Sequence, residues 1–186
     1  MVCIDGEELY YESLVYLMLY KPQGVISATQ DEEHETVLDG IDVLLPKGCF
    51  PVGRLDIDTE GLLLITNDGQ LSHRLLSPKH HVAKTYLAKI AQPLSEADIA
   101  LLEGGTIVLD DKPLLPAQVV QRSENEIIIT IQEGRYHQIK RMLQAVGNEV
   151  CYLKRLTMGP LELDDILQPG EWRFLSDEEI AALQAV

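Results

Sequence analysis

The stretch that decides the fold runs from residue 53 to residue 69 and reads Gly53-Arg54-Leu55-Asp56-Ile57-Asp58-Thr59-Glu60-Gly61-Leu62-Leu63-Leu64-Ile65-Thr66-Asn67-Asp68-Gly69. Its apolar residues, Ile57 and 62–65, form a run too short for a helix, and it stops at Asn67-Asp68-Gly69, a strong signal for a tight turn. We therefore expect a buried central strand here. Several polar residues crowd into the loop before that strand, and loops in such positions often carry the chemistry of a protein.

The rest of the chain predicts an α+β fold, in which helices flank a mixed or mostly antiparallel sheet. Strands are expected at residues 15–20, 25–28, 85–90, 107–109, 117–121 and 126–132. The isoleucine-rich last strand is expected to be buried on both faces. Helices are expected at residues 71–76, 96–102 and 137–146, with a final helix after Ser176. Ser95 with Asp98, and Ser176 with Glu179, are capping-box signals, and Gly147 is expected to end the third helix.

The composition is that of an ordinary globular chain, with 186 residues, 46% hydrophobic and 24% charged. Residues 1–13 are polar and acidic and are expected to be a linker, with residues 14–186 forming one domain. Charges and prolines interrupt the apolar stretches, so we expect no membrane span, and the acidic start does not resemble a signal peptide. Cys3, Cys49 and Cys151 are scattered without the spacing of metal ligands. We therefore expect a cytoplasmic protein without a disulfide framework or a metal site.

The distribution of charged residues along the chain indicates whether the protein binds nucleic acid. A net charge of −15 argues against nucleic acid, because phosphate binding relies on lysine and arginine. Residues 70–92, however, contain four basic residues and no acid, and residues 134–160 contain five basic residues against Glu149 alone. This pattern is typical of a basic face on an acidic body. Composition leaves open the alternative that the two windows are solvated surfaces that never meet in space.

Four stretches together resemble one known family. The run from Gly53 to Gly69 closely resembles the signature of the RsuA family of pseudouridine synthases. Three further stretches follow the order and approximate spacing of the family: Tyr16 to Ser27 is similar to its opening strand and Lys-Pro-x-Gly turn, Lys84-Thr85-Tyr86 to its tyrosine segment, and Glu133 to Met142 to its third motif. The resemblance covers about residues 15–183. It implies the pseudouridine synthase fold.

The resemblance also implies a reaction and the residues that perform it. The enzyme would break the bond between ribose and N1 of uracil, rotate the base and rejoin ribose to C5, which requires no metal and no cofactor. Asp56 would be the nucleophile and Lys140 its basic partner. Lysine keeps the positive charge that holds a buried carboxylate ionised, but lacks the fork of arginine. Tyr86 would stack on the uracil and take the proton from C5.

The resemblance further implies an RNA partner. A uridine in folded RNA must leave its stack before it can react. Arg54 would fill the vacated space or hold a neighbouring phosphate. The residues expected to bind the RNA backbone are Lys84, Arg135, His137, Arg141, Lys154 and Arg155. His137 is equally well interpreted as a structural hydrogen-bonding group.

The branch of the family, and so the substrate, is less directly indicated. Residues 80–86 and 167–172 are most similar to the branch that modifies one uridine of 16S ribosomal RNA, whereas the 23S branch shares the same four motifs. The expected partner is ribosomal RNA or a partly assembled ribosomal subunit, bound by a monomer. Many members carry a small RNA-binding domain of ribosomal-protein type before the catalytic domain. Here Val2 to Glu7 resembles the end of the connector to such a domain.

Other interpretations remain open from the residues alone. Asp56 is otherwise a turn carboxylate, or joins Asp58 and Asp68 in a magnesium site, although Asp58 is expected to point away. A non-catalytic RNA-binding or ribosome assembly factor would retain the basic face without needing Asp56. A small-molecule hydrolase with paired carboxylates would have little use for the two acid-poor windows. Loss of function in an Asp56→Ala variant and salt-sensitive RNA binding separate these classes.

Overall fold

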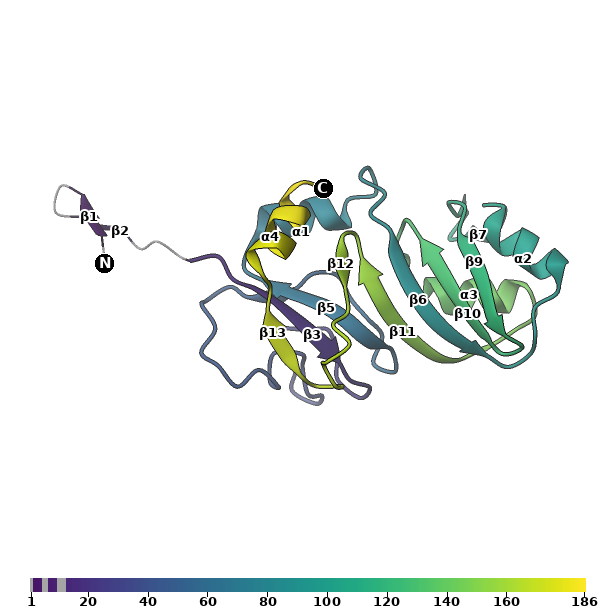
Figure 1. Cartoon of the computed structure of the whole chain (residues 1–186), viewed down its shortest axis with the longest axis horizontal. Helices are drawn as coiled ribbons and strands as arrows, with labels where there is room; N and C mark the ends of the chain where they lie inside the picture. The colour runs from purple at the N-terminus through teal and green to yellow at the C-terminus, as the bar shows by residue number, and fades with distance from the viewer. Residues whose placement is uncertain (1, 5–6, 10–12) are drawn as a thin grey trace.

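A large mixed sheet forms the centre of this computed structural model, which describes residues 2–4, 7–9 and 13–186 (Figure 1). The strand order along the sheet is β13-β3-β5-β11-β6-β10-β9. All neighbours are antiparallel except β5 and β11. The strands are β3 (Tyr16–Lys21), β5 (Glu60–Thr66), β6 (Lys84–Ile90), β9 (Gln118–Ser123), β10 (Glu126–Ile131), β11 (Val150–Met158) and β13 (Trp172–Phe174). Two short strands, β4 (Phe50–Pro51) and β12 (Leu161–Glu162), pair with β5 and β11.

Among the described residues, helices lie near both ends of the sheet (Figure 1). They are α1 (Gly69–Leu76), α2 (Glu96–Glu103), α3 (Gln138–Ala145) and α4 (Asp177–Gln184). One apolar cluster joins α1 and α4 to alternate residues of β3 and β5. A second cluster joins α2 and α3 to the other residues of the same strands and to β6 and β10. Strands β3 and β5 are therefore buried on both faces, which explains their continuous apolar sequence.

Most local predictions are confirmed. The run at residues 62–65 is the middle of β5, which has two strands on one side of it and four on the other in the sheet order. Both capping boxes form, at Ser95 before α2 and at Ser176 before α4. Gly147 follows the end of α3 with φ +73°, the left-handed conformation expected there. The α+β prediction of a mixed sheet flanked by helices is confirmed.

Several predictions are wrong. Strand β11 was not predicted, and residues 25–28 form only one bridge, from Ile26 to Thr36. The isoleucine strand β10 alternates between buried and half-buried residues, so it is not buried on both faces. Asp68 accepts a hydrogen bond from the Leu71 amide and caps α1, where a tight turn was expected. Residues 107–109 and 112–113 contribute the small hairpin β7 (Val108–Leu109) and β8 (Lys112–Pro113).

The predicted linker at residues 1–13 is only partly described. Val2–Ile4 (β1) and Glu7–Leu9 (β2) pair as an antiparallel ribbon, so these residues form an element where a linker was expected. Residues 1, 5–6 and 10–12 lie outside the described residues. Within the described residues, none of the helices is both long and apolar enough to cross a membrane.

The contact between β5 and β11 leaves no room for a side chain at Gly61. Gly61 has φ +107°, and a Cβ built there would lie 2.6 Å from the Arg155 amide nitrogen and closer still to the Arg155 carbonyl oxygen. These atoms belong to the strand backbone and cannot move aside. Glycine is therefore required where the two strands meet.

Two basic residues predicted to bind RNA lie inside the protein. Arg155 is 2% exposed, and its Nε donates to the Leu62 carbonyl. Lys84 is 7% exposed, and its Nζ donates to the Val82 carbonyl. Burial, and then the charge of Arg155, lower the pKa of Lys84 to about 8. The expectation that these two residues hold surface phosphates is therefore wrong, because neither head group reaches the surface.

We predict that Gly61→Ala lowers the free energy of unfolding by about 2–4 kcal/mol, because it adds backbone strain and a clash between strands. Urea unfolding followed by circular dichroism measures this. Gly69→Ala is the matched control, since a Cβ at Gly69 meets nothing within 4 Å. Equal stability of the two variants would contradict the close contact.

We also predict a pH-dependent effect for Lys84→Met. Wild-type Lys84 loses its proton near pH 8 when folded and about pH 10.4 when unfolded, so the unfolded state binds more protons between these values. Stability of the wild type therefore gains from this group as pH rises through that window. The stability of Lys84→Met relative to wild type should fall between pH 7.5 and 10. Lys79→Met, at an exposed position, serves as the control. A difference in the free energy of unfolding between Lys84→Met and wild type that stays constant with pH would refute the prediction.

Candidate active site

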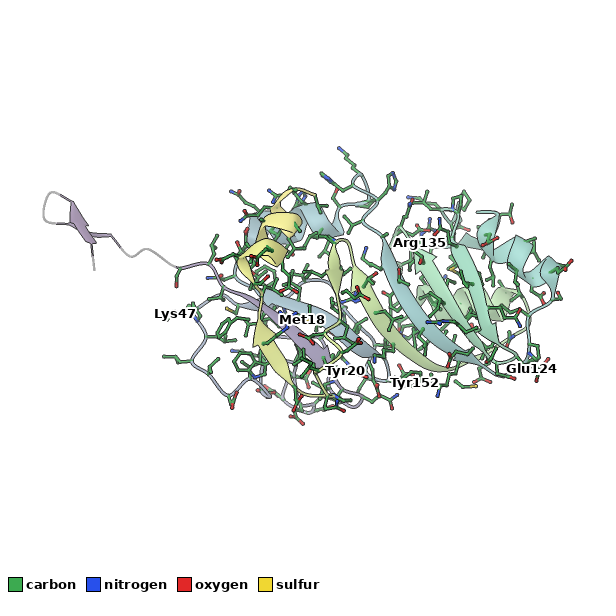
Figure 2. The ribbon with its side chains drawn as sticks, viewed as in Figure 1. Met18, Tyr20, Lys47, Glu124, Arg135 and Tyr152 are labelled. Atoms are coloured by element: carbon green, nitrogen blue, oxygen red, sulfur yellow. The ribbon has the colours of Figure 1, made fainter. Side chains whose placement is uncertain are left out.

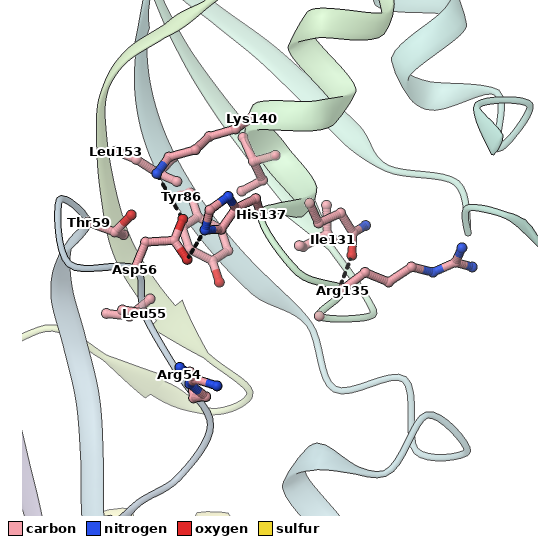
Figure 3. A pocket seen from close by; sticks show the side chains of 13 residues that line it. Arg54, Leu55, Asp56, Thr59, Tyr86, Ile131, Arg135, His137, Lys140 and Leu153 are labelled. Atoms are coloured by element: carbon pink, nitrogen blue, oxygen red, sulfur yellow. Dashed lines mark hydrogen bonds and ion pairs between the residues drawn. The ribbon is translucent and has the colours of Figure 1, made fainter. Parts of the chain in front are cut away.

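A cavity of about 80 Å³ opens where the loop before β5 faces the start of α3 (Figure 3). Three of its walls come from distant parts of the sequence: the 54–59 loop, strands β6, β10 and β11, and the turn that leads into α3. The lining residues are Arg54, Leu55, Asp56, Thr59, Tyr86, Ile131, Gly134, Arg135, His137, Gln138, Ile139, Lys140 and Leu153. The three residues predicted to be catalytic, Asp56, Tyr86 and Lys140, are thus brought together around one cavity.

Asp56 stands at the centre of a cluster of charges. Lys140 Nζ lies 2.9 Å from Asp56 Oδ2 and 2.6 Å from Asp58 Oδ1, so one ammonium bridges two carboxylates. On the other side, His137 Nε2 lies 3.4 Å from Asp56 Oδ1. The expectation that Asp58 points away from the site is wrong, since it shares Lys140 with Asp56. The Asp56 side chain is about one quarter exposed, so a molecule in the cavity can reach it.

The shared ion pair shifts the pKa values of Lys140 and Asp58. Burial opposes the charge of Lys140, but its hydrogen bonds with Asp58 and Asp56 and their negative charges raise its pKa above the usual value. Burial likewise opposes ionisation of Asp58, but the hydrogen bond and charge of Lys140 hold the pKa of Asp58 below its usual value. Lys140 therefore stays charged at neutral pH and offsets the cost of placing carboxylates together.

Lys21 fixes the loop that carries Asp56. Its side chain is fully buried, and its Nζ donates to the carbonyls of Thr59 at 2.9 Å and Ile57 at 3.5 Å, and to that of Pro22. The Thr59 amide in turn donates to the Asp56 carbonyl. Burial lowers the pKa of Lys21 to about 8, although the nearby carboxylates, Asp58 first, oppose this shift. The ammonium thus binds the backbone on both sides of Asp58 and so limits movement of the loop.

The remaining walls of the cavity are mainly apolar. Tyr86, on β6, is 8% exposed and lies beside Leu153 of β11 and Ile131 of β10 (Figure 3). Thr59 is 2% exposed, and its hydroxyl has no hydrogen-bond partner among the described residues. Apolar walls beside a carboxyl group and an ammonium group are suited to enclosing a flat, uncharged ring next to polar groups.

The turn before α3 aims His137 at Asp56. His137 has φ +48°, a left-handed conformation that is uncommon for a residue with a side chain. The turn is secured by the Gln138 side chain, whose Oε1 accepts from the Arg135 amide at 2.9 Å. An uncommon backbone conformation that places a side chain against a carboxylate in a cavity indicates that the placement of His137 matters.

Arg135 and Arg141 bind protein groups, not open surface. Arg135 donates from its Nε to Glu133, and from its terminal nitrogens to the carbonyls of Leu109, Lys112 and Pro113. Arg141 forms a two-point ion pair with Asp110. Both guanidinium groups fasten the β7–β8 hairpin beside the site, and the prediction that they hold RNA phosphates stays a prediction.

The last two predicted RNA-binding residues differ in position. Arg54 is exposed and lines the cavity two residues before Asp56. Lys154 does not line this cavity. Its neighbour Leu153 does, whereas Lys154 lines a second cavity of about 300 Å³. Successive residues of a strand face opposite sides. There Lys154 Nζ lies 4.6 Å from the centre of the Tyr20 ring.

A bridge beneath that second cavity was also missed from sequence. The hydroxyls of Tyr20 and Tyr152, two residues labelled in Figure 2, both donate to Glu60 Oε2, at 3.3 and 2.8 Å. Glu60 therefore ties β3 to β11 across β5, directly after the loop that holds Asp56. Burial first, and then the Glu60 hydrogen bond, raise the pKa of Tyr152.

Within the described residues, no group of three His, Cys, Asp or Glu side chains is placed to hold a metal ion.

Comparison with known proteins now adds to the geometry. Residues 15–145 match the family described as RNA pseudouridylate synthase. The Bacillus subtilis protein named "Uncharacterized RNA pseudouridine synthase YtzG" is 49% identical over 98% of this chain and 78% of its own length. The Escherichia coli "Ribosomal small subunit pseudouridine synthase A" is 45% identical over 98% of this chain and 80% of its own.

Solved structures agree. A crystal structure described as a pseudouridylate synthase superimposes with a TM-score of 0.87 and 41% identity, covering 94% of this chain and 75% of that one. The expected pseudouridine synthase fold is confirmed by this similarity. From its sequence and its fold alike, the chain belongs to the RNA pseudouridylate synthase family, the isomerases that convert uridine in RNA to pseudouridine.

Proposed function

We propose that this protein isomerises one uridine of small-subunit (16S) ribosomal RNA, with Asp56 as the nucleophile. The observation that carries the proposal is the ion pair of Asp56 with Lys140 in the mouth of a cavity walled by Tyr86. The relative from Escherichia coli is named for the ribosomal small subunit, which supports the choice of RNA. Ribosomal RNA places the proposed reaction in the cytoplasm, and we propose that a monomer performs it.

In this proposal the reaction begins with the Asp56 carboxylate. The carboxylate either adds to ribose C1′ as the bond from C1′ to N1 breaks, or assists removal of the proton from C2′ to give a glycal. In both routes the bond electrons leave with the uracil, which stays in the cavity. The base turns and C5 bonds to C1′, which breaks the bond from the Asp56 oxygen to C1′ in the first route and returns the proton to C2′ in the second. The proton on C5 is then removed, and N1 takes up a proton, so that the reaction is an isomerisation. We assign that proton removal to Tyr86, which depends on positioning because a phenol is a weak base at neutral pH.

Lys140 supplies the positive charge beside the nucleophile in this proposal. The cation shared between Asp56 and Asp58 stabilises the carboxylate before attack and after it leaves the sugar. We propose that Arg54, exposed at the edge of the cavity, fills the space that the uridine leaves in the RNA stack. Base flipping of this kind brings the target within reach of a carboxylate that lies inside a pocket.

We predict that Asp56→Ala abolishes release of tritium from [5-³H]uridine-labelled RNA, by at least about a thousandfold. Wild type and variant are compared on 16S and 23S RNA, each free and in partly assembled particles. Wild-type release from 16S alone supports the proposal. Release from 23S alone contradicts the choice of RNA. Undiminished release by Asp56→Ala contradicts the nucleophile, and the absence of wild-type release from every substrate favours a non-catalytic RNA-binding factor.

We predict that Lys140→Met lowers kcat about a hundredfold, because the carboxylates lose their shared cation, whereas Lys140→Arg keeps kcat within about tenfold of wild type. The same tritium assay measures both variants, and circular dichroism checks their folding. If Lys140→Met turns over as fast as Lys140→Arg, charge at this position does not contribute to the reaction.

A further inference from the structure

Most of the residues expected to bind RNA do not present a free positive charge at the cavity. Of the seven residues expected to bind RNA, Lys84 and Arg155 are buried, Arg135 and Arg141 hold the β7–β8 hairpin, and Lys154 lines a different cavity. The chain as a whole carries a net charge of −15. Charge attraction alone is therefore a poor account of how RNA is held at the cavity, and an uncharged mode of contact is needed.

Tyr136 offers such a contact. Its side chain is 74% exposed, which is unusual for a large aromatic residue in an ordered turn. Its ring lies flat on that of His137, with centroids 3.7 Å apart and planes inclined by 19°. His137 in turn lies 3.4 Å from the carboxylate of Asp56. Two stacked rings thus extend from the nucleophile out to the surface.

The turn holds this pair in place before any ligand arrives. The Tyr136 carbonyl accepts a hydrogen bond from Arg141, which is itself paired with Asp110. Before Tyr136 in the sequence, the Arg135 guanidinium is bound to the β7–β8 hairpin. After His137, Gln138 begins α3, and its side chain accepts a hydrogen bond from the Arg135 amide. A platform that is already ordered loses little entropy when it binds.

We propose that Tyr136, supported by His137, is a stacking platform for an unpaired nucleobase next to the target uridine. When a uridine leaves its stack, its neighbours lose a partner, and exposed aromatic rings commonly replace such partners in RNA complexes. Stacking is tolerant of base identity and does not depend on positive charge. The platform would hold the strand beside Asp56 while Arg54 acts on the opposite side of the flipped nucleotide. This inference rests on the RNA-directed activity proposed above.

The test compares three substitutions at Tyr136 in the tritium assay. Tyr136→Phe keeps the ring, Tyr136→Leu keeps an apolar side chain without a ring, and Tyr136→Ala removes both. We expect KM for labelled RNA to rise about tenfold in the Leu and Ala variants and to stay within about twofold of wild type in Phe, with kcat little changed in all three. The midpoint of thermal unfolding should not move, because the side chain is exposed.

The salt dependence of KM distinguishes binding by stacking from binding by charge attraction. The increase in KM caused by Tyr136→Ala should be the same at about 50 and 200 mM KCl, whereas the increase caused by Arg54→Ala should shrink as salt rises. The proposal is overturned if Tyr136→Leu binds like wild type, if Tyr136→Phe is as weak as Tyr136→Ala, or if the weaker binding accompanies a lowered unfolding temperature.

A direct measurement keeps the platform testable if the proposed activity fails. Single-stranded RNA carrying 2-aminopurine beside a uridine is titrated with each variant, since stacking quenches this base. Quenching by wild type and Tyr136→Phe but not by Tyr136→Leu supports the platform even without turnover. Equal fluorescence changes with all variants overturn it, whereas a wild type that releases no tritium from any RNA refutes the proposed reaction alone.

Discussion

The whole arrangement depends on the contact of two strand backbones at Gly61. Strands β5 and β11 are the only parallel pair in the sheet order and share two residue pairs, Lys154 with Glu60 and Arg155 with Gly61. This short seam joins the half of the sheet covered by α1 and α4 to the half covered by α2 and α3. The loop with Asp56 enters β5 at the seam, and Tyr86 lies on the strand beyond β11. A side chain at Gly61 would separate Asp56 from the wall of the cavity that faces it.

Several positively charged side chains in and around the site are paired with acceptors of the protein itself. Lys140 is shared by Asp56 and Asp58, Lys21 is buried under their loop, and each arginine of the third motif binds acceptors within the protein. A strongly acidic protein can hold a reactive carboxylate in this way because its cations are placed one by one against specific partners. The consequence for RNA recognition is that shape and stacking contribute where a field of positive charge is lacking.

The local features of the fold were predictable, and the long-range pairings were not. The capping boxes at Ser95 and Ser176 and the apolar run of β5 depend only on residues that lie close together in the sequence. Strand β11 was missed because Lys154 and Arg155 break its apolar pattern, and nothing local shows that an arginine is buried. The sequence motifs placed Asp56, Tyr86 and Lys140 correctly around one cavity. They could not show that Arg141 meets Asp110, since that pair spans 31 residues. Lys21 was overlooked as well, although a lysine that ends an apolar strand run is a visible signal.

The pairing of β13 with β3 has a consequence for how the protein is made. Strand β3 is buried on both faces, and one of its edges is completed by residues 172–174. At about 5–20 residues per second, the ribosome needs roughly ten seconds or more to synthesise the intervening chain. During that time an apolar strand has one edge without its native partner, and such edges invite pairing with other chains. The edge of β3 that β13 covers in the folded protein therefore stays open to such pairing until residues 172–174 have been synthesised.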